Sequence, residues 1–373
     1  MFSQKNDPKQ TPTGLITAIV SNAIRSRASD IHWEPYRDKS EEGTLVRFRV
    51  DGILRDIEKI SGKTNQGLVV NAIKVMTTID PTRKRISQDG RFDILIGEAT
   101  YDIRVSIMPT ITGEKIVMRI TNKNAFCLPI SELGMKGRQL ELFKSLINKP
   151  EGFVLITGPA GSGKTTTLYS ILANLYKREI NICTIEDPVE VKFNGINQIQ
   201  VDHEFGMTFV AGLRAIMRQD PNIIAVGEIR DVETVRTAFQ ASLVGSMVFS
   251  TLHAKDTINT ITRLLDMGIE PFFISAALGG VVSQRLVRLL CVNCHGRGCI
   301  ECHNMGFIKR IGIFEVLKMT ERLRQMVLRR TTADELRAAA VEEGMFTFAE
   351  SVAPLISQGV TTKDEVDSIL TLD

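Results

Sequence analysis

A glycine-rich stretch near the middle of the chain constrains the fold more than any other part of the sequence. It reads Gly-Pro-Ala-Gly-Ser-Gly-Lys-Thr-Thr over residues 158–166. An apolar run over residues 152–157 precedes it. Leu168, Ile171 and Leu172 recur at helical spacing after it. A strand, a glycine loop and a helix in this order surround a polyphosphate with backbone N–H groups and the positive end of a helix dipole.

The residues of this loop have separate expected tasks. Lys164 reaches the β- and γ-phosphates of a nucleotide, and the Thr165 hydroxyl can coordinate Mg²⁺. The alternative, a flexible glycine turn with a chance lysine, explains neither the flanking strand nor the helix. We therefore expect a nucleoside triphosphate to be contacted by Gly158, Pro159, Ala160, Gly161, Ser162, Gly163, Lys164, Thr165 and Thr166.

Composition excludes several other classes of protein. A chain of 373 residues is long enough for two or three domains. Its net charge of +3 gives no sign of a nucleic-acid footprint, so we expect no direct nucleic-acid partner. No apolar run reaches the roughly 18 residues that a membrane span needs. The polar N-terminal residues do not resemble a signal peptide, and we expect a cytoplasmic protein.

The region before the loop predicts a mixed α/β domain of its own. Apolar residues between Leu15 and Ile24 recur at helical spacing after Thr13, which can cap that helix. Asp-Gly at positions 51 and 52 predicts a hairpin, and the runs 92–96 and 101–107 predict a second one. After residue 133, strands alternate with helices, which predicts a parallel sheet covered on both faces.

Polar side chains follow two buried strands of the second region. Glu228 comes just after the apolar run 223–226, where enzymes with this type of loop need an acid to hold Mg²⁺ or to orient water. The competing interpretation is a surface glutamate. His253 follows the run 247–251, so it lies at the same sheet edge as the loop. A single histidine is more often structural than catalytic.

A third strand end carries three acids, Glu186, Asp187 and Glu190. Carboxylates this close repel one another unless a metal, an arginine or water shares their charge. One of them is a candidate general base for an attacking water. An acidic loop that ends at Pro188 explains the same spacing equally well.

Four of the six cysteines lie within twelve residues. Cys291, Cys294, Cys299 and Cys302 form two CxxC pairs, which can supply four thiolates to a tetrahedral Zn²⁺. His295 or His303 can replace one of them, and free or redox-active thiols are the weaker alternative. A structural zinc contributes on the order of 10 kcal/mol to ordering a small module.

Taken together, these segments resemble the ATPases of type II secretion and type IV pilus assembly, from about residue 15 to residue 370. The segment GPAGSGKTTTLY resembles the Walker A loop of that family, and RQDPNIIAVGEIRD at 218–231 resembles its Walker B motif. The other matching segments are ASDIHWEP at 28–35, RFRVDG at 47–52, QDGR at 88–91, TIEDPVE at 184–190 and STLHAKD at 250–256. The resemblance is to a short form without the additional N-terminal domain of longer members.

The resemblance implies a homohexamer that hydrolyses ATP with Mg²⁺ at interfaces between neighbouring subunits. It implies that Glu186 is the general base, that Glu228 lies near Mg²⁺ and its water, and that His253 senses the γ-phosphate. Arg91 and Arg104 would reach the phosphates when the first domain closes over the nucleotide, and an arginine fork suits phosphate oxygens. The partner implied is an inner-membrane platform protein, with the motor peripheral at that membrane.

We therefore expect an α/β protein with a RecA-like P-loop motor, a smaller mixed α/β (PAS-like) domain before it and a zinc knuckle with helices after it. The expected divisions are a flexible leader (1–12), the mixed α/β domain (13–121), a linker (122–132), the motor domain (133–285), a four-cysteine zinc module (286–318) and a helical region (319–373). Alternative functions are a DNA-uptake or conjugation-type motor, a nucleic-acid-stimulated RecA-like ATPase, or an assembly scaffold with little turnover.

Overall fold

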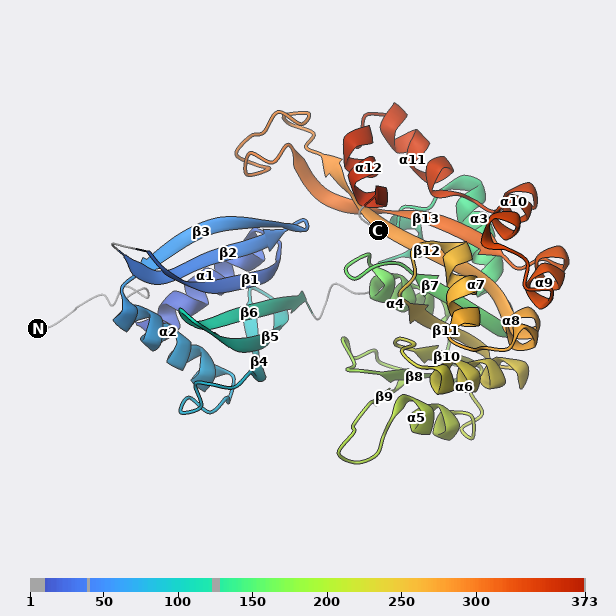
Figure 1. Cartoon of the computed structure of the whole chain (residues 1–373), viewed down its shortest axis with the longest axis horizontal. Coiled ribbons are helices and arrows are strands. Elements are labelled where there is room, and N and C mark those ends of the chain that lie inside the picture. The colour runs from blue at the N-terminus through green and yellow to red at the C-terminus, as the bar shows by residue number, and fades with distance from the viewer. Residues whose placement is uncertain (1–10, 39–40, 123–127, 372–373) are drawn as a thin grey trace, which may run out of the picture. The chain divides into compact units, whose positions relative to one another are not determined.

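The computed structural model describes residues 11–38, 41–122 and 128–371. It divides into two compact units, residues 1–125 and 126–373, each with its own sheet (Figure 1). The expected leader lies outside the described residues up to position 10, as does Cys127. Within the described ranges, every helix is too short or too polar to cross a membrane.

The first unit is built on a six-stranded sheet in the order β3-β2-β1-β6-β5-β4, in which every neighbouring pair is antiparallel. Asp51 and Gly52 both have positive φ, at 49° and 89°, as the two-residue hairpin turn between β2 and β3 requires. This confirms the hairpin expected at Asp-Gly. The strands are β1 (Ala28–Arg37), β2 (Glu42–Val50), β3 (Ile53–Ser61), β4 (Gln88–Ile96), β5 (Ala99–Thr110) and β6 (Gly113–Asn122).

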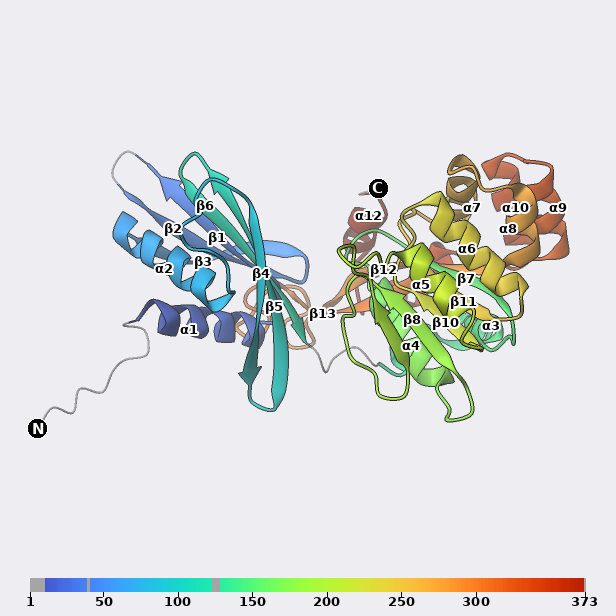
Figure 2. The same cartoon turned by 90° about the horizontal axis from the view of Figure 1, so that it is seen from below.

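Helices α1 (Pro12–Arg25) and α2 (Lys63–Met76) contact each other and cover one face of this sheet (Figure 2). The cap of α1 is Thr11, whose hydroxyl accepts a hydrogen bond from Gly14 N–H at 3.1 Å, so the expected cap at Thr13 is wrong. Pro12 explains the shift, because proline favours the first helical position and places the cap one residue earlier. The unit is therefore a mixed α/β domain, as expected.

The second unit is built on a seven-stranded sheet in the order β13-β12-β7-β11-β10-β8-β9. Every neighbouring pair is parallel except β12 and β13. The strands are β7 (Gly152–Thr157), β8 (Ile182–Glu186), β9 (Asn197–Gln200), β10 (Ile223–Val226), β11 (Met247–Leu252), β12 (Leu278–Leu290) and β13 (Phe307–Lys318).

Helices cover both faces of this sheet, as the alternation of side chains along β7 shows. Phe153 and Leu155 pack into one hydrophobic cluster, and Val154 and Ile156 pack into the other. The first cluster contains α5 (Phe209–Ile216), α6 (Val232–Leu243), α7 (Thr257–Asp266), α8 (Pro271–Ala277), α9 (Glu321–Leu328) and α10 (Ala333–Glu342). The second contains η2 (Ile130–Glu132), α3 (Gly137–Ile147) and α4 (Lys164–Leu175). The expected doubly covered parallel sheet is confirmed.

The four cysteines lie in the loop that joins β12 to β13. The expected start of the cysteine module at residue 286 falls inside β12, which pairs with β13 along most of its length. The last two helices, α11 (Phe348–Ser357) and α12 (Lys363–Thr371), pack on this hairpin through a separate small cluster. The sheet of the second unit therefore extends to the base of the cysteine loop.

A buried ion pair in the first unit anchors the segment that leads into β4. The ammonium of Lys74 is fully buried and contacts Glu114 Oε1 at 2.7 Å. It also donates a hydrogen bond to the carbonyl oxygen of Arg83 at 2.8 Å. Removing one partner of a buried pair leaves a charge without its counterion.

We predict that Glu114→Ala lowers the free energy of unfolding by about 3 kcal/mol, because the buried ammonium loses its counterion. Trp33 is the only tryptophan and is buried in β1, so its fluorescence during urea unfolding reports on the first unit. Glu42→Ala is the matched control: its exposed pair with Arg37 spans 3.8 Å and contributes less than about 1 kcal/mol. Equal effects of the two variants would contradict the prediction.

Candidate active site

The glycine loop lies between β7 and α4, at the carboxyl edge of the parallel sheet. Gly163 is the N-cap of α4 and has φ of 89°, a left-handed conformation that favours glycine. Thr165 and Thr166 follow in the first turn, and the Thr165 side chain is exposed. The predicted binding residues therefore lie in the loop before α4 and in the first turn of that helix: Gly158, Pro159, Ala160, Gly161, Ser162, Gly163, Lys164, Thr165 and Thr166.

Lys164 folds back over the loop. Its ammonium donates hydrogen bonds to the carbonyl oxygens of Gly158 and Pro159, each at 2.8 Å. Burial lowers the pKa of Lys164 to about 8; the charge of Glu228 opposes this effect, and the charge of Arg285 adds to it. The Ser162 hydroxyl is buried without a hydrogen-bond partner in the described part of the chain. An unused hydroxyl and a desolvated ammonium in the same loop fit a phosphate ligand.

Two polar residues of β12 lie near the site, Gln284 beside the glycine loop and Arg285 beside the loop after β11, and the sequence analysis missed both. The Gln284 side chain accepts a hydrogen bond from Thr167 at 2.7 Å, and its amide nitrogen lies 2.8 Å from where a Cβ on Gly163 would be. Arg285 donates to the Lys255 carbonyl oxygen at 2.6 Å. Both are buried although they are polar, and polar residues that follow the apolar residues at the start of this strand were the signal for them in the sequence.

Glu228 and His253 meet at the same edge. His253 Nε2 lies 3.8 Å from Glu228 Oε2, and Arg230 forms ion pairs with Glu228 and with Asp187. Burial lowers the pKa of His253; Lys164 and Arg230 add to the decrease and Glu228 opposes it, so the imidazole is neutral at pH 7. Glu228 is the carboxylate that interacts electrostatically with Lys164, which suits a group near Mg²⁺.

Glu186 is the last residue of β8 and is buried. Its carboxylate accepts hydrogen bonds from the hydroxyls of Tyr169 and Thr184, both at 2.5 Å, and from the Gln198 amide at 3.2 Å. Asp187, the next acid of the segment, pairs instead with Arg230. Glu186 is thus a buried carboxylate held by three hydrogen bonds.

Arg91 and Arg104 belong to the first unit, so they are on a different unit from the glycine loop. They are direct partners across β4 and β5, and Arg104 is in turn the partner of Arg119 on β6. The register thus places three arginines in one row, the third of which the sequence analysis missed. Arg104 also contacts Asp102 at 3.3 Å, and Arg119 contacts Asp30 at 3.1 Å.

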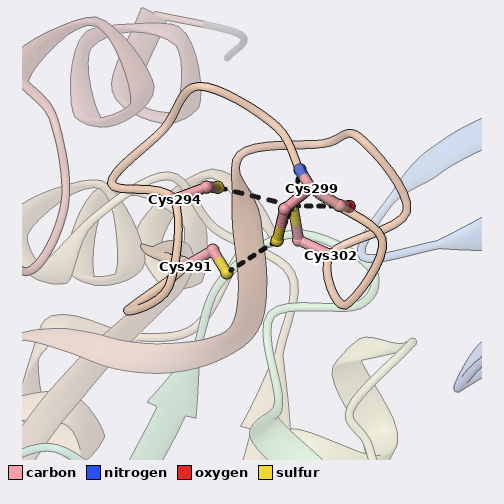
Figure 3. Close-up of side chains that lie close together, drawn as sticks. All are labelled: Cys291, Cys294, Cys299 and Cys302. Atoms are coloured by element: carbon pink, nitrogen blue, oxygen red, sulfur yellow. Dashed lines mark hydrogen bonds between the residues drawn. The ribbon is translucent and has the colours of Figure 1, made fainter.

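The four cysteine side chains point toward one another (Figure 3). Sulfur–sulfur distances are 3.8 Å from Cys291 to Cys299 and 3.7 Å from Cys302 to each of Cys294 and Cys299. Four thiolates about 2.3 Å from a tetrahedral zinc are about 3.8 Å apart, whereas a disulfide spans about 2.05 Å. The spacing fits a metal and does not fit disulfides.

Backbone groups stabilise one of these thiolates. The N–H groups of Cys299 and Gly306 donate to Cys302 Sγ at 3.2 Å each. Burial raises the pKa of Cys302, but these bonds and the neighbouring thiols together outweigh burial and lower the pKa to about 6. A thiolate is the form that binds zinc.

The fold and the glycine loop define a P-loop ATPase. The chain belongs to the family described as type II/IV secretion system protein, whose model matches residues 5–368. It is 43% identical to the type II secretion system protein E of Pseudomonas aeruginosa, over 94% of this chain and 74% of that protein. It is 40% identical to the type IV pilus assembly ATPase PilB of Myxococcus xanthus, over 94% of this chain and 66% of that protein.

The fold also has solved counterparts. The structure of the ATPase DotB of Legionella pneumophila covers 97% of this chain, and the match covers 96% of DotB, with a TM-score of 0.74 at 22% identity. At that identity the likeness concerns the fold, which is a RecA-like α/β motor with a smaller α/β domain, as the sequence predicts.

We predict that nucleotide binding takes up a proton at pH 8.5 but not at pH 7.0. In the protein without nucleotide the pKa of Lys164 is about 8, and the negative charge of bound phosphates raises it. Nucleotide binding therefore weakens as pH rises past about 8. Calorimetry of Mg·ADP binding in buffers with different ionisation enthalpies measures the uptake. A binding enthalpy at pH 8.5 that does not depend on the buffer would contradict the prediction.

Proposed function

We propose that this protein is the motor ATPase of a type II secretion pseudopilus or type IV pilus assembly machine. The observation that carries the proposal is the meeting of Lys164, Glu186, Glu228 and His253 at one edge of the parallel sheet, in a chain of the secretion family. A nucleotide bound to the loop brings its γ-phosphate to the edge where these groups lie.

The residues divide the reaction among them. Lys164 and the loop amides bind the phosphates, and Thr165 and Glu228 are the groups that would hold Mg²⁺. Mg²⁺ supplies neutralisation of the charge on the phosphate oxygens. Glu186 orients the attacking water and accepts its proton, and neutral His253 faces the γ-phosphate as a sensor. Arg91 and Arg104 contribute positive charge that stabilises the transition state.

The motor works as a homohexamer and passes its conformational change to an inner-membrane platform protein. The names of the relatives, a type II secretion system protein E and a type IV pilus assembly ATPase, support the assignment to such a machine, and the hexamer and the platform partner rest on the family resemblance. Purification of the full chain followed by identification of the membrane protein that remains bound tests it. Capture of nucleic acid in place of a membrane protein would contradict it.

We also propose that Cys291, Cys294, Cys299 and Cys302 hold a structural Zn²⁺. All four sulfur atoms lie within 4.8 Å of one another, and three of the four residues are buried. Four thiolates leave no open position on a tetrahedral zinc, so the expected task of the ion is to order the loop between β12 and β13.

Lys164→Ala should lower the rate of ATP hydrolysis by about 100-fold or more, because the phosphate charge loses its main ammonium partner. The fold should survive, since Lys164 lies in a loop-to-helix junction rather than in a hydrophobic cluster. Phosphate release measures the rate of hydrolysis, and circular dichroism shows whether the fold survives. Lys144→Ala, on the exposed face of α3, is the matched control and should keep the parental rate. Parental turnover in Lys164→Ala would refute the assignment.

Elemental analysis of the purified chain should find about one zinc per chain. Cys302→Ser should lose most of it, because Cys302 Sγ contacts two of the other sulfurs. Cys183→Ser, whose thiol is buried in β8 away from the loop, should keep it. A metal-free protein after purification without chelators would rule the site out.

A further inference from the structure

Tyr169 is a buried tyrosine that the sequence analysis did not assign to any task. It lies in the second turn of α4, five residues after Lys164, and is 1% exposed. Its hydroxyl donates to Glu186 Oε2 at 2.5 Å and lies 3.3 Å from the Val191 carbonyl oxygen. A buried tyrosine needs a hydrogen-bond partner, and here the closer partner is the carboxylate proposed as the base.

The hydrogen bonds of Glu186 leave little of its carboxylate unused. An ionised carboxylate has about four lone-pair sites, two on each oxygen. Oε1 accepts from Thr184 and from Gln198, so both of its sites are filled. Oε2 accepts from Tyr169 alone within the described residues. The site that remains for a water is therefore on the oxygen that Tyr169 holds.

We propose that Tyr169 is the positioning residue for the base, setting the direction of the one open lone pair of Glu186. This inference rests on the proposed function, in which Glu186 is the base. It adds that the helix whose N-terminus binds the phosphates also holds the base, through a hydroxyl on the next turn. Nucleotide and base are then aligned by one rigid element, α4.

The surroundings of Tyr169 keep its hydroxyl a donor. Burial raises the pKa of Tyr169, and the charges of Glu186 and Glu190 raise it further, so the phenol stays protonated through the neutral range. The amide of Gln198 approaches the same hydroxyl at 3.4 Å from β9, and it carries no charge. Hydrogen bonds to charged groups are stronger than those between neutral groups, and the loss of one is expected to lower a rate by roughly tenfold to hundredfold.

Tyr169→Phe removes the hydroxyl and keeps the ring. We expect kcat for ATP hydrolysis to fall about tenfold while the dissociation constant of Mg·ADP stays within twofold of the parental value. Tyr176→Phe is the matched control: it changes a tyrosine at the other end of α4 that packs edge-on against Phe193, and it should keep both constants. A general loosening of α4 would instead weaken nucleotide binding along with kcat.

Thr184→Val provides a second route if Tyr169→Phe folds poorly. It removes the hydroxyl that donates to Oε1, leaves α4 untouched and should give the same split between kcat and binding. A parental or higher kcat in folded Tyr169→Phe overturns the inference, and so does an equal loss of kcat and affinity. If Tyr169→Phe does not fold, a parental kcat in Thr184→Val overturns it.

Glu186→Gln separates this inference from the proposal beneath it. Loss of the general base should lower kcat by about 100-fold or more. If Glu186→Gln hydrolyses ATP at the parental rate, the assignment of the base fails, and the positioning role fails with it. If Glu186→Gln is inactive and Tyr169→Phe is parental, the base assignment stands and the positioning role alone is wrong.

Discussion

The close packing of β12 against the glycine loop is the contact on which the site depends. A Cβ at Gly158 would lie 2.4 Å from the backbone carbonyl oxygen of Gln284, and a Cβ at Gly163 would lie 2.8 Å from the side-chain amide nitrogen of Gln284. Glycine at these two positions therefore lets the loop lie directly on the strand. The loop then turns sharply enough for Lys164 to reach back to the carbonyl of Gly158. This turn places the N-terminus of α4 where its backbone N–H groups can bind a phosphate.

Parallel pairing brings the remaining groups to the same place. Glu186 ends β8, Glu228 follows β10 and His253 follows β11, and these strands are neighbours of β7 or of one another. Each strand contributes one polar residue at its carboxyl end, where the loops of such sheets bind ligands. Opposite charges at this edge influence one another directly: Glu228 supports the charged form of Lys164, while burial opposes it.

Local pattern was enough to predict the glycine loop, the strand at 223–226 and the hairpin at Asp51, because each is encoded by neighbouring residues. It was not enough for β1 or for β12, each of which pairs on one side with a strand far along the chain, β6 and β7 respectively. Tyr169 and Gln284 were missed for the same reason. Tyr169 looks like an ordinary core residue of an amphipathic helix, and only the fold shows that its hydroxyl meets Glu186.

Strand β12 connects the glycine loop, which it contacts at Gln284, to the cysteine loop, which begins after Leu290. From Gln284 to Leu290 the strand covers about 20 Å, at about 3.3 Å per residue, and then enters the cysteine loop. The C-terminal segment grips the far end of that strand, since Leu290 N–H donates to the Val360 carbonyl oxygen at 2.8 Å and Arg288 pairs with buried Glu365. A shift of the glycine loop would therefore be passed along β12 toward the cysteine loop. The C-terminal helices, which pack on the far part of that strand, would hold it in place.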